Sequence, residues 1–164
     1  MNFPASFEQG NRQMFLLFRV RGELYGTPLA GVREVVPYSA PRSVPNTKKF
    51  YLGIVNLKGE IVGVVDMRLW FQDDKPASDK NSFRALVVFD SSAGLMAVAA
   101  EAIESICQLE NKDIEYSKSI PSSFSSGGMI GLGRFKQGLA TLLDIRALFS
   151  QIDVAAERKE RWAS

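Results

Sequence analysis

Short apolar runs alternate with polar turns along the chain, and this pattern is typical of β-strands joined by tight turns. Residues 15–20 read FLLFRV, and a turn at 21–23 separates them from a second candidate strand at 24–29. Residues 30–36 read AGVREVV, and the valines of this segment have helical spacing. We therefore expect a helical turn that runs into a third strand.

The following segment predicts a β-hairpin and then a short capped helix. Apolar runs at 53–57 and 60–65 are joined by Lys58 and Gly59, and glycine tolerates the positive φ that a tight hairpin turn requires. Asp66 follows directly. Its carboxylate can accept the otherwise unpaired amide hydrogens of the first helical turn, so we expect it to be a helix cap.

A second series of strands begins near residue 83, after a polar linker at 72–82. The elements expected in it are strands at 84–90 and 95–100, a turn-and-strand element at 101–107, a long loop at 108–128, a hairpin at 130–143 and a short helix capped by Asp144. The order of elements is that of the first series.

The two series align at constant offsets. Pairs 71 residues apart are Phe18 with Phe89, Leu24 with Leu95, Val32 with Ile103, and Val35 with Ile106. Pairs 78 residues apart are Gly53 with Gly131, Lys58 with Lys136, Asp66 with Asp144, Arg68 with Arg146, and Phe71 with Phe149. Agreement of such different residue types at one offset favours an internal repeat over chance matching of strand-rich segments.

The repeat predicts an all-β fold of two small, five-stranded, SH3-like β-barrel subdomains with short helical turns. We expect a flexible N-terminal tail at 1–13 and a single domain at 14–150, in which two intertwined β-subdomains share an interface. The remaining residues, 151–164, are expected to form a helical or disordered tail.

The amino-acid composition excludes several classes of function, although it says little about the fold. The sequence has no histidine, which removes Ser-His-Asp and Cys-His catalysis and any histidine metal site. Its single cysteine, Cys107, cannot form an intramolecular disulfide, and a net charge of +2 with scattered basic residues gives little support for nucleic-acid binding. No apolar run approaches the roughly 20 residues of a membrane span, so we expect a cytoplasmic protein without direct membrane insertion.

Candidate chemistry is sparse. Asp66 and Asp144 are possible acid–base carboxylates, but each stands where a strand meets a short helix, and capping alone explains that placement. No convergent polar cluster is visible, so a small β-barrel ligand-binding protein or enzyme is the weaker alternative. We expect no catalytic residue, no metal site and no cofactor.

Three segments carry a resemblance to a known family. GIVNLKGEIVGVVDMR resembles the signature of the CheW-like domain, and FLLFRVRGELYGTPLAGVREVVPY resembles the N-terminal segment of that family. GLGRFKQGLATLLDIRALF fits the family's closing hairpin and helix, and the similarity spans about residues 14–150. The resemblance implies two five-stranded β-barrel subdomains around a hydrophobic interior, as the repeat predicts independently.

The resemblance also implies a function. Family members are non-catalytic adaptors that couple methyl-accepting chemoreceptors to a CheA-type histidine kinase in arrays at the inner membrane face. They contact the cytoplasmic hairpin tip of the receptor through the groove between subdomains, and they dock against the CheW-like regulatory domain of the kinase. By position, the candidate receptor- or kinase-binding residues are Val32, Val35, Val36, Ile54, Val55, Asn56, Lys58 and Gly59.

The sequence departs from the family's pattern at two positions. The family usually has arginine where Lys58 stands, and lysine cannot make the bidentate fork that arginine makes. Gly63 stands where the family often has proline. Related scaffolds also serve twitching motility or surface sensing, and the sequence leaves that alternative open.

Overall fold

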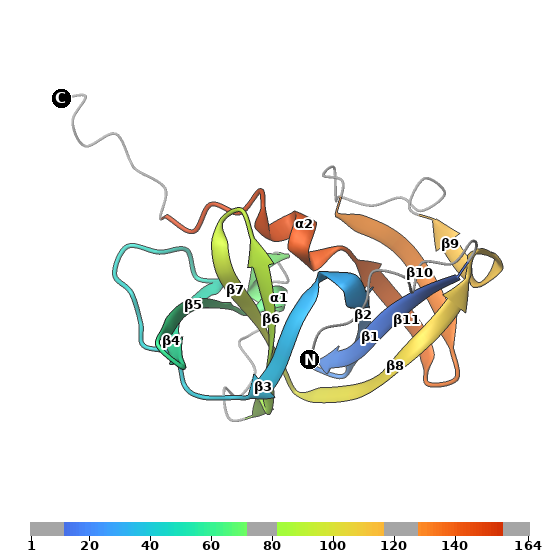
Figure 1. Ribbon diagram of the computed structural model, residues 1–164, viewed down its shortest axis with the longest axis horizontal. Coiled ribbons are helices and arrows are strands. Elements are labelled where there is room, and N and C mark those ends of the chain that lie inside the picture. Colours follow the sequence, from blue (N-terminus) through green and yellow to red (C-terminus); the bar gives the residue numbers. More distant parts are fainter. Residues whose placement is uncertain (1–11, 72–81, 117–127, 156–164) are drawn as a thin grey trace.

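The computed structural model describes residues 12–71, 82–116 and 128–155, and this part of the chain forms two β-sheets and two short α-helices (Figure 1). The strands are β1 (Arg12–Val20), β2 (Glu23–Pro28), β3 (Val32–Pro37), β4 (Tyr51–Leu57), β5 (Glu60–Val65), β6 (Ala85–Ser91), β7 (Gly94–Ala100), β8 (Ala102–Glu110), β9 (Ile114–Tyr116), β10 (Met129–Phe135) and β11 (Gly138–Leu143). The helices are α1 (Met67–Trp70) and α2 (Ile145–Phe149), and 3-10 turns lie at Leu29–Gly31 and Asn111–Asp113.

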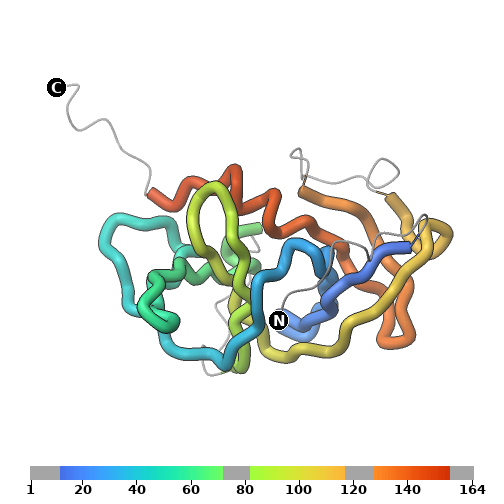
Figure 2. Tube along the Cα trace, in the orientation of Figure 1, coloured from blue at the N-terminus to red at the C-terminus, as the bar shows by residue number. Residues whose placement is uncertain are grey.

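Each sheet is built from both halves of the sequence. One sheet has the strand order β8-β1-β2-β11-β10-β9, and the other has the order β3-β6-β7-β5-β4. Hairpin β1–β2 therefore lies between strands of the second half, and hairpin β6–β7 lies between strands of the first half (Figure 1). We call the two units the six-stranded and the five-stranded subdomain. The trace in Figure 2 crosses from one to the other after β2 and again after β7.

The registers of the strands repeat as well as their order. Strand β2 pairs with β11 in parallel with Tyr25 opposite Thr141, and β7 pairs with β5 in parallel with Met96 opposite Gly63. These positions are related by the offsets of 71 and 78 that relate the two halves of the sequence. The predicted all-β fold of two repeat-related subdomains is confirmed, with β9 as an additional strand in one sheet.

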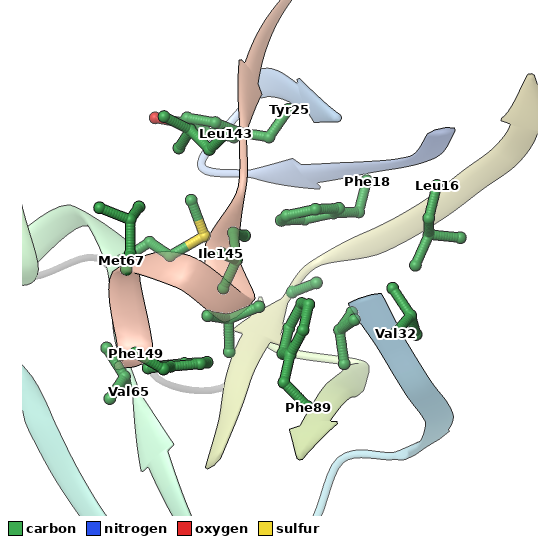
Figure 3. Packing of buried hydrophobic residues seen from close by; sticks show 14 of the residues in the cluster. Leu16, Phe18, Tyr25, Val32, Val65, Met67, Phe89, Leu143, Ile145 and Phe149 are labelled. Carbon is green, nitrogen blue, oxygen red and sulfur yellow. The ribbon is translucent and has the colours of Figure 1, made fainter. Parts of the chain in front are cut away.

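The exchanged hairpins are buried on both faces. In β1, Phe15 and Leu17 face the core of the six-stranded subdomain, whereas Leu16 and Phe18 face a central cluster between the two subdomains (Figure 3). Strand β6 alternates in the same way between the core of the five-stranded subdomain and the central cluster. Burial on both faces explains why these strands read as continuous apolar runs rather than as alternating ones.

The prediction of a long loop at 108–128 is wrong for its first residues. Strand β8 continues to Glu110, and after a 3-10 turn β9 pairs with β10. The predicted N-terminal tail is also shorter than 1–13, because β1 begins at Arg12, whose guanidinium lies 3.6 Å from the Glu110 carboxylate. The remainder of both predicted segments, 117–127 and 1–11, lies outside the described residues.

The C-terminal segment that begins at Gln151 is not helical in its described part, which ends at Ala155. The Lys48 amide donates to the Val154 carbonyl at 2.8 Å, and Ala155 forms a bridge with Thr47. The reason is the alternation of apolar and polar residues, which lets Ile152 and Val154 pack against the central cluster in an extended conformation. Residues 156–164 and most of the predicted linker, 72–81, lie outside the described residues.

Candidate interaction surface

The eight candidate binding residues lie in β3 and in hairpin β4–β5, all within the five-stranded subdomain. Strands β3 and β4 are the two ends of that sheet's strand order. An ion pair nevertheless connects the two regions, because Nη2 of Arg33 in β3 lies 3.1 Å from Oε2 of Glu60, the first residue of β5. The structure therefore brings one face of β3 beside the turn of the β4–β5 hairpin.

The three valines of β3 differ in exposure. Val35 is 42% exposed, Val36 is half-buried against the core of the five-stranded subdomain, and Val32 is buried in the central cluster. The predicted helical turn running into a strand is confirmed, because the 3-10 turn Leu29–Gly31 leads directly into β3. All three valines lie in the strand part, whose register against β6 shifts between Val32 and Glu34. Val32 therefore packs in the central cluster beneath the surface, and Val35 is the β3 valine that is accessible to a partner.

In the β4–β5 hairpin, the alternation of the strand decides which candidates are accessible. Val55 is buried and Ile54 is half-buried, whereas Asn56, Lys58 and Gly59 are exposed. Both turn residues have positive φ, 51° for Lys58 and 88° for Gly59, as a two-residue type I′ turn requires. The Asn56 side-chain oxygen accepts from the Gly59 amide at 2.8 Å, so Asn56 also holds the turn in shape.

The structure shows exposed apolar residues that the sequence reasoning missed. Besides Val35, the large apolar residues exposed in the described part of the chain include Ile61, Ile103, Ile106, Tyr116 and Leu139. Ile61 corresponds to Leu139 by the repeat, and Val35 corresponds to Ile106. Alternation gave no signal for them, because β5 and β11 each begin with two successive exposed residues and are then mostly buried.

The charges beside these apolar residues are reversed between the two subdomains. Arg33 and Glu104 are repeat-related, and each stands at a β-bulge. Arg33 lies 4.0 Å from the carboxylate of Asp90, whereas Glu104 accepts a hydrogen bond from Nε of Arg19 at 2.6 Å. Exposed pairs of this kind contribute roughly 0.2–1 kcal/mol to stability. Their main consequence is that two similar surfaces carry opposite charge at one equivalent position, which a partner can distinguish.

Asp66 and Asp144 both act as helix caps in the structure. Oδ1 of Asp66 accepts from the Arg68 amide at 3.0 Å, and Oδ1 of Asp144 accepts from the Ala147 amide at 3.1 Å. Burial raises the pKa of Asp66 above its usual value, while the Arg21 guanidinium and the Leu69 amide act in the opposite direction. Among the residues that the structure describes, no group of His, Cys, Asp and Glu is arranged to hold a metal ion.

Gly63, for which the sequence offered no explanation, has a packing role. A β-carbon at this position would lie 2.8 Å from the Tyr51 hydroxyl oxygen and 2.9 Å from Sδ of Met96. The side chain of Tyr51 thus occupies the space over Gly63, and burial of this tyrosine raises its pKa.

Within the described ranges, none of the helices has the length and apolar character needed to cross a membrane.

Comparisons with known proteins agree with this architecture. A family model described as the CheW-like domain matches residues 14–153. The chemotaxis protein CheW of Klebsiella aerogenes is 25% identical over 143 residues, which cover 87% of this chain and 85% of that protein. The chemotaxis protein CheW of Treponema pallidum is 23% identical over 144 residues, which cover 85% of each chain.

A solved structure supports the fold. The crystal structure of the scaffolding protein TtCheW from Thermoanaerobacter tengcongensis superimposes with a TM-score of 0.68 at 21% sequence identity. The match covers 80% of this chain and 88% of that chain, so the two-subdomain architecture is shared over most of both molecules.

Proposed function

The chain belongs to the CheW-like domain family, and on that premise we propose that it is a non-catalytic adaptor that couples methyl-accepting chemoreceptors to a CheA-type histidine kinase. The observation that carries the proposal is the family match over residues 14–153. Relatives named as chemotaxis and scaffolding proteins, aligned over most of their length, support a chemotaxis coupling role. The proposed location is the cytoplasmic side of the inner membrane, where the receptors would hold the adaptor in an array.

We assign the receptor contact to the exposed part of the candidate surface. Val35 supplies an accessible apolar side chain on β3, and Lys58 supplies a positive charge at the neighbouring hairpin turn. A helical hairpin tip presents apolar and charged side chains from adjacent turns, which suits a surface of this mixed character. Because lysine makes a single charge contact rather than a bidentate one, the recognition at Lys58 depends on charge more than on planar geometry.

The buried candidates have a different role in this proposal. Val32 and Val55 lie within apolar clusters and position the strands that carry the exposed residues. Gly59 allows the turn, and Asn56 fixes it through the hydrogen bond to the Gly59 amide. The proposed kinase partner is the CheW-like regulatory domain of the CheA-type kinase, which would bind in the same complex.

The test measures binding of purified variants to a receptor cytoplasmic fragment and to the kinase regulatory domain. Val35→Arg and Lys58→Glu are expected to weaken binding to at least one of the two partners by tenfold or more, about 1.4 kcal/mol. Ile106→Arg is the matched control, because Ile106 is the exposed repeat-related position on the other subdomain. If both test variants fold and bind both partners as the unmodified protein does, the assigned surface is wrong.

The choice of chemosensory system needs a second experiment. A pull-down from native cytoplasm and membranes, analysed by mass spectrometry, is expected to recover a CheA-type kinase together with methyl-accepting receptors. The receptors recovered would distinguish a flagellar array from a twitching or surface-sensing array. Recovery of neither partner from cells that express both would contradict the adaptor function.

A further inference from the structure

The turn between β1 and β2 contains an arginine that reaches across the junction of the two subdomains. Arg21 follows β1 of the six-stranded subdomain, and Asp66 follows β5 of the five-stranded subdomain. Nη2 of Arg21 lies 3.6 Å from Oδ2 of Asp66, and the two side chains are only 8% and 5% exposed. A buried ion pair thus joins the two units beside the apolar central cluster.

The same turn is attached to the segment in which the chain crosses between subdomains. The Arg21 amide donates to the Glu101 carboxylate, and the Glu101 amide donates to the Arg19 carbonyl at 2.9 Å. Glu101 stands between β7 of one subdomain and β8 of the other. Asp66 meanwhile uses its other oxygen to cap α1. The β1–β2 turn is therefore held against both the crossing segment and the start of α1.

The repeat-related junction is built differently. Ser92 stands at the position that corresponds to Arg21, and Asp144 stands at the position that corresponds to Asp66. Nε of Arg146, an exposed residue of α2, donates to the Asp90 carbonyl in β6 at 2.9 Å. One junction therefore has a buried ion pair, and the other has a hydrogen bond from an exposed side chain.

The energetics of the buried pair indicate what it contributes. Removing two charges from water costs free energy that their attraction offsets only in part, so buried ion pairs add little net stability. Burial is the dominant influence on the pKa of Asp66 and outweighs the opposing effect of Arg21, which agrees with that principle. Separating the two side chains would leave each as an uncompensated buried charge, which is strongly destabilising, so the pair disfavours other arrangements of the elements that carry it.

We propose that the Arg21–Asp66 pair is a fixed pivot that sets the relative orientation of the two subdomains. In this proposal the Arg146–Asp90 hydrogen bond is the contact that breaks when that orientation changes. This inference does not depend on the identity of the binding partners. It assigns to Arg21 a positioning role that the two halves of the repeat do not share.

The experiment measures the distance between the subdomains with two spin labels and pulsed electron paramagnetic resonance. In a Cys107→Ala background, the labels are placed at Ile61→Cys and Leu139→Cys, which are repeat-related, on different subdomains, and 56% and 59% exposed. Arg21→Ser introduces the residue found at the other junction, and Asp66→Asn removes the charge while keeping a side-chain oxygen for the cap. Both are expected to broaden or shift the distance distribution, and Arg21→Lys is expected to restore part of the narrow distribution.

Two controls separate a pivot from general loosening. Arg19→Ser removes an ion pair within the six-stranded subdomain, and it is expected to leave the distribution unchanged. Arg146→Ser is expected to broaden the distribution less than Arg21→Ser does. The inference is overturned if the distance distributions of folded Asp66→Asn and Arg21→Ser coincide with that of the unmodified protein. It is also overturned if Arg19→Ser broadens the distribution as much as Arg21→Ser does, or if Arg146→Ser broadens it more. If Arg21→Ser does not fold, Asp66→Asn alone decides between these results.

Discussion

Exchange of hairpins between the two sheets predicts that the subdomains unfold as one cooperative unit. Leu86→Ala in β6 truncates a fully buried side chain in the core of the five-stranded subdomain. Leu142→Ala in β11 does the same in the core of the six-stranded subdomain. Because β6 also contributes its opposite face to the central cluster, a defect on one side of this strand is expected to weaken both subdomains.

The magnitude follows from the burial. Leucine to alanine removes the equivalent of about three methylene groups at about 0.8 kcal/mol each, which gives roughly 2.4 kcal/mol. Both leucines are 0% exposed in close-packed clusters, so the residual cavity adds to this loss. The expected decrease in the free energy of unfolding is about 3–4 kcal/mol for each variant. A decrease of that size lowers the folding equilibrium constant by more than about a hundredfold.

Native-state hydrogen exchange gives the required resolution, because it reports opening of each strand separately. Amides of β4–β5 and of β10–β11 belong to different subdomains, and in each variant we expect both sets to lose protection by the same free energy. Leu139→Ala is the control, with an expected change within about 0.5 kcal/mol because this leucine is exposed. If Leu86→Ala lowers protection in β4–β5 and leaves β10–β11 unchanged, the reasoning from strand exchange is refuted.

Two further predictions concern a glycine and a buried carboxylate. Gly53→Ala places a β-carbon 2.1 Å from the Arg42 carbonyl oxygen, so it is expected to cost more than roughly 2 kcal/mol, whereas Gly59→Ala meets nothing within 4 Å and is expected to cost about 1 kcal/mol for its positive φ alone. Urea denaturation measures both, and equal losses would contradict the steric argument. Because the folded pKa of Asp66 is raised above 3.8, the stability gained from its proton is complete below pH 3.8 and is lost as pH rises through the folded pKa. Asp66→Asn should remove this dependence in unfolding curves recorded over that interval, and an unchanged pH dependence would show that another group is responsible.

The sequence predicts individual strands well because local physics determines them. Hairpin β4–β5 is set by two apolar runs and by a Lys58–Gly59 turn with positive φ, and Asp66 is placed by the need of a helix start for an acceptor. The exchange of hairpins is not encoded locally. Strand β1 can satisfy the same apolar pattern beside β3 or beside β8, since Val35 and Ile106 are equivalent in the repeat. The 3-10 turn Leu29–Gly31 leads from β2 into β3 of the other sheet, and β1 is therefore left to pair with β8.

The candidate surface shows a similar limit. Family motifs place the candidates in β3 and the β4–β5 hairpin, but the motifs do not say which side chains face outward. Alternation within β4 would have shown that Val55 points inward between its neighbours. The burial of Val32 was not readable in the same way, because the bulge at Arg33 changes the alternation of β3 and leaves no clear signal in the sequence.

The position of hairpin β1–β2 has a consequence for synthesis of the chain on the ribosome. Arg19 and its partner Glu104 in β8 are 85 residues apart, and the other sheet neighbour, β11, is completed still later at Leu143. At about 5–20 residues per second, translation of that interval takes roughly 4–17 s. During this time both edges of an early hairpin await strands that do not yet exist. Completion of the fold is therefore a late event, and the N-terminal hairpin is the segment that chaperones have most reason to protect until β11 has emerged.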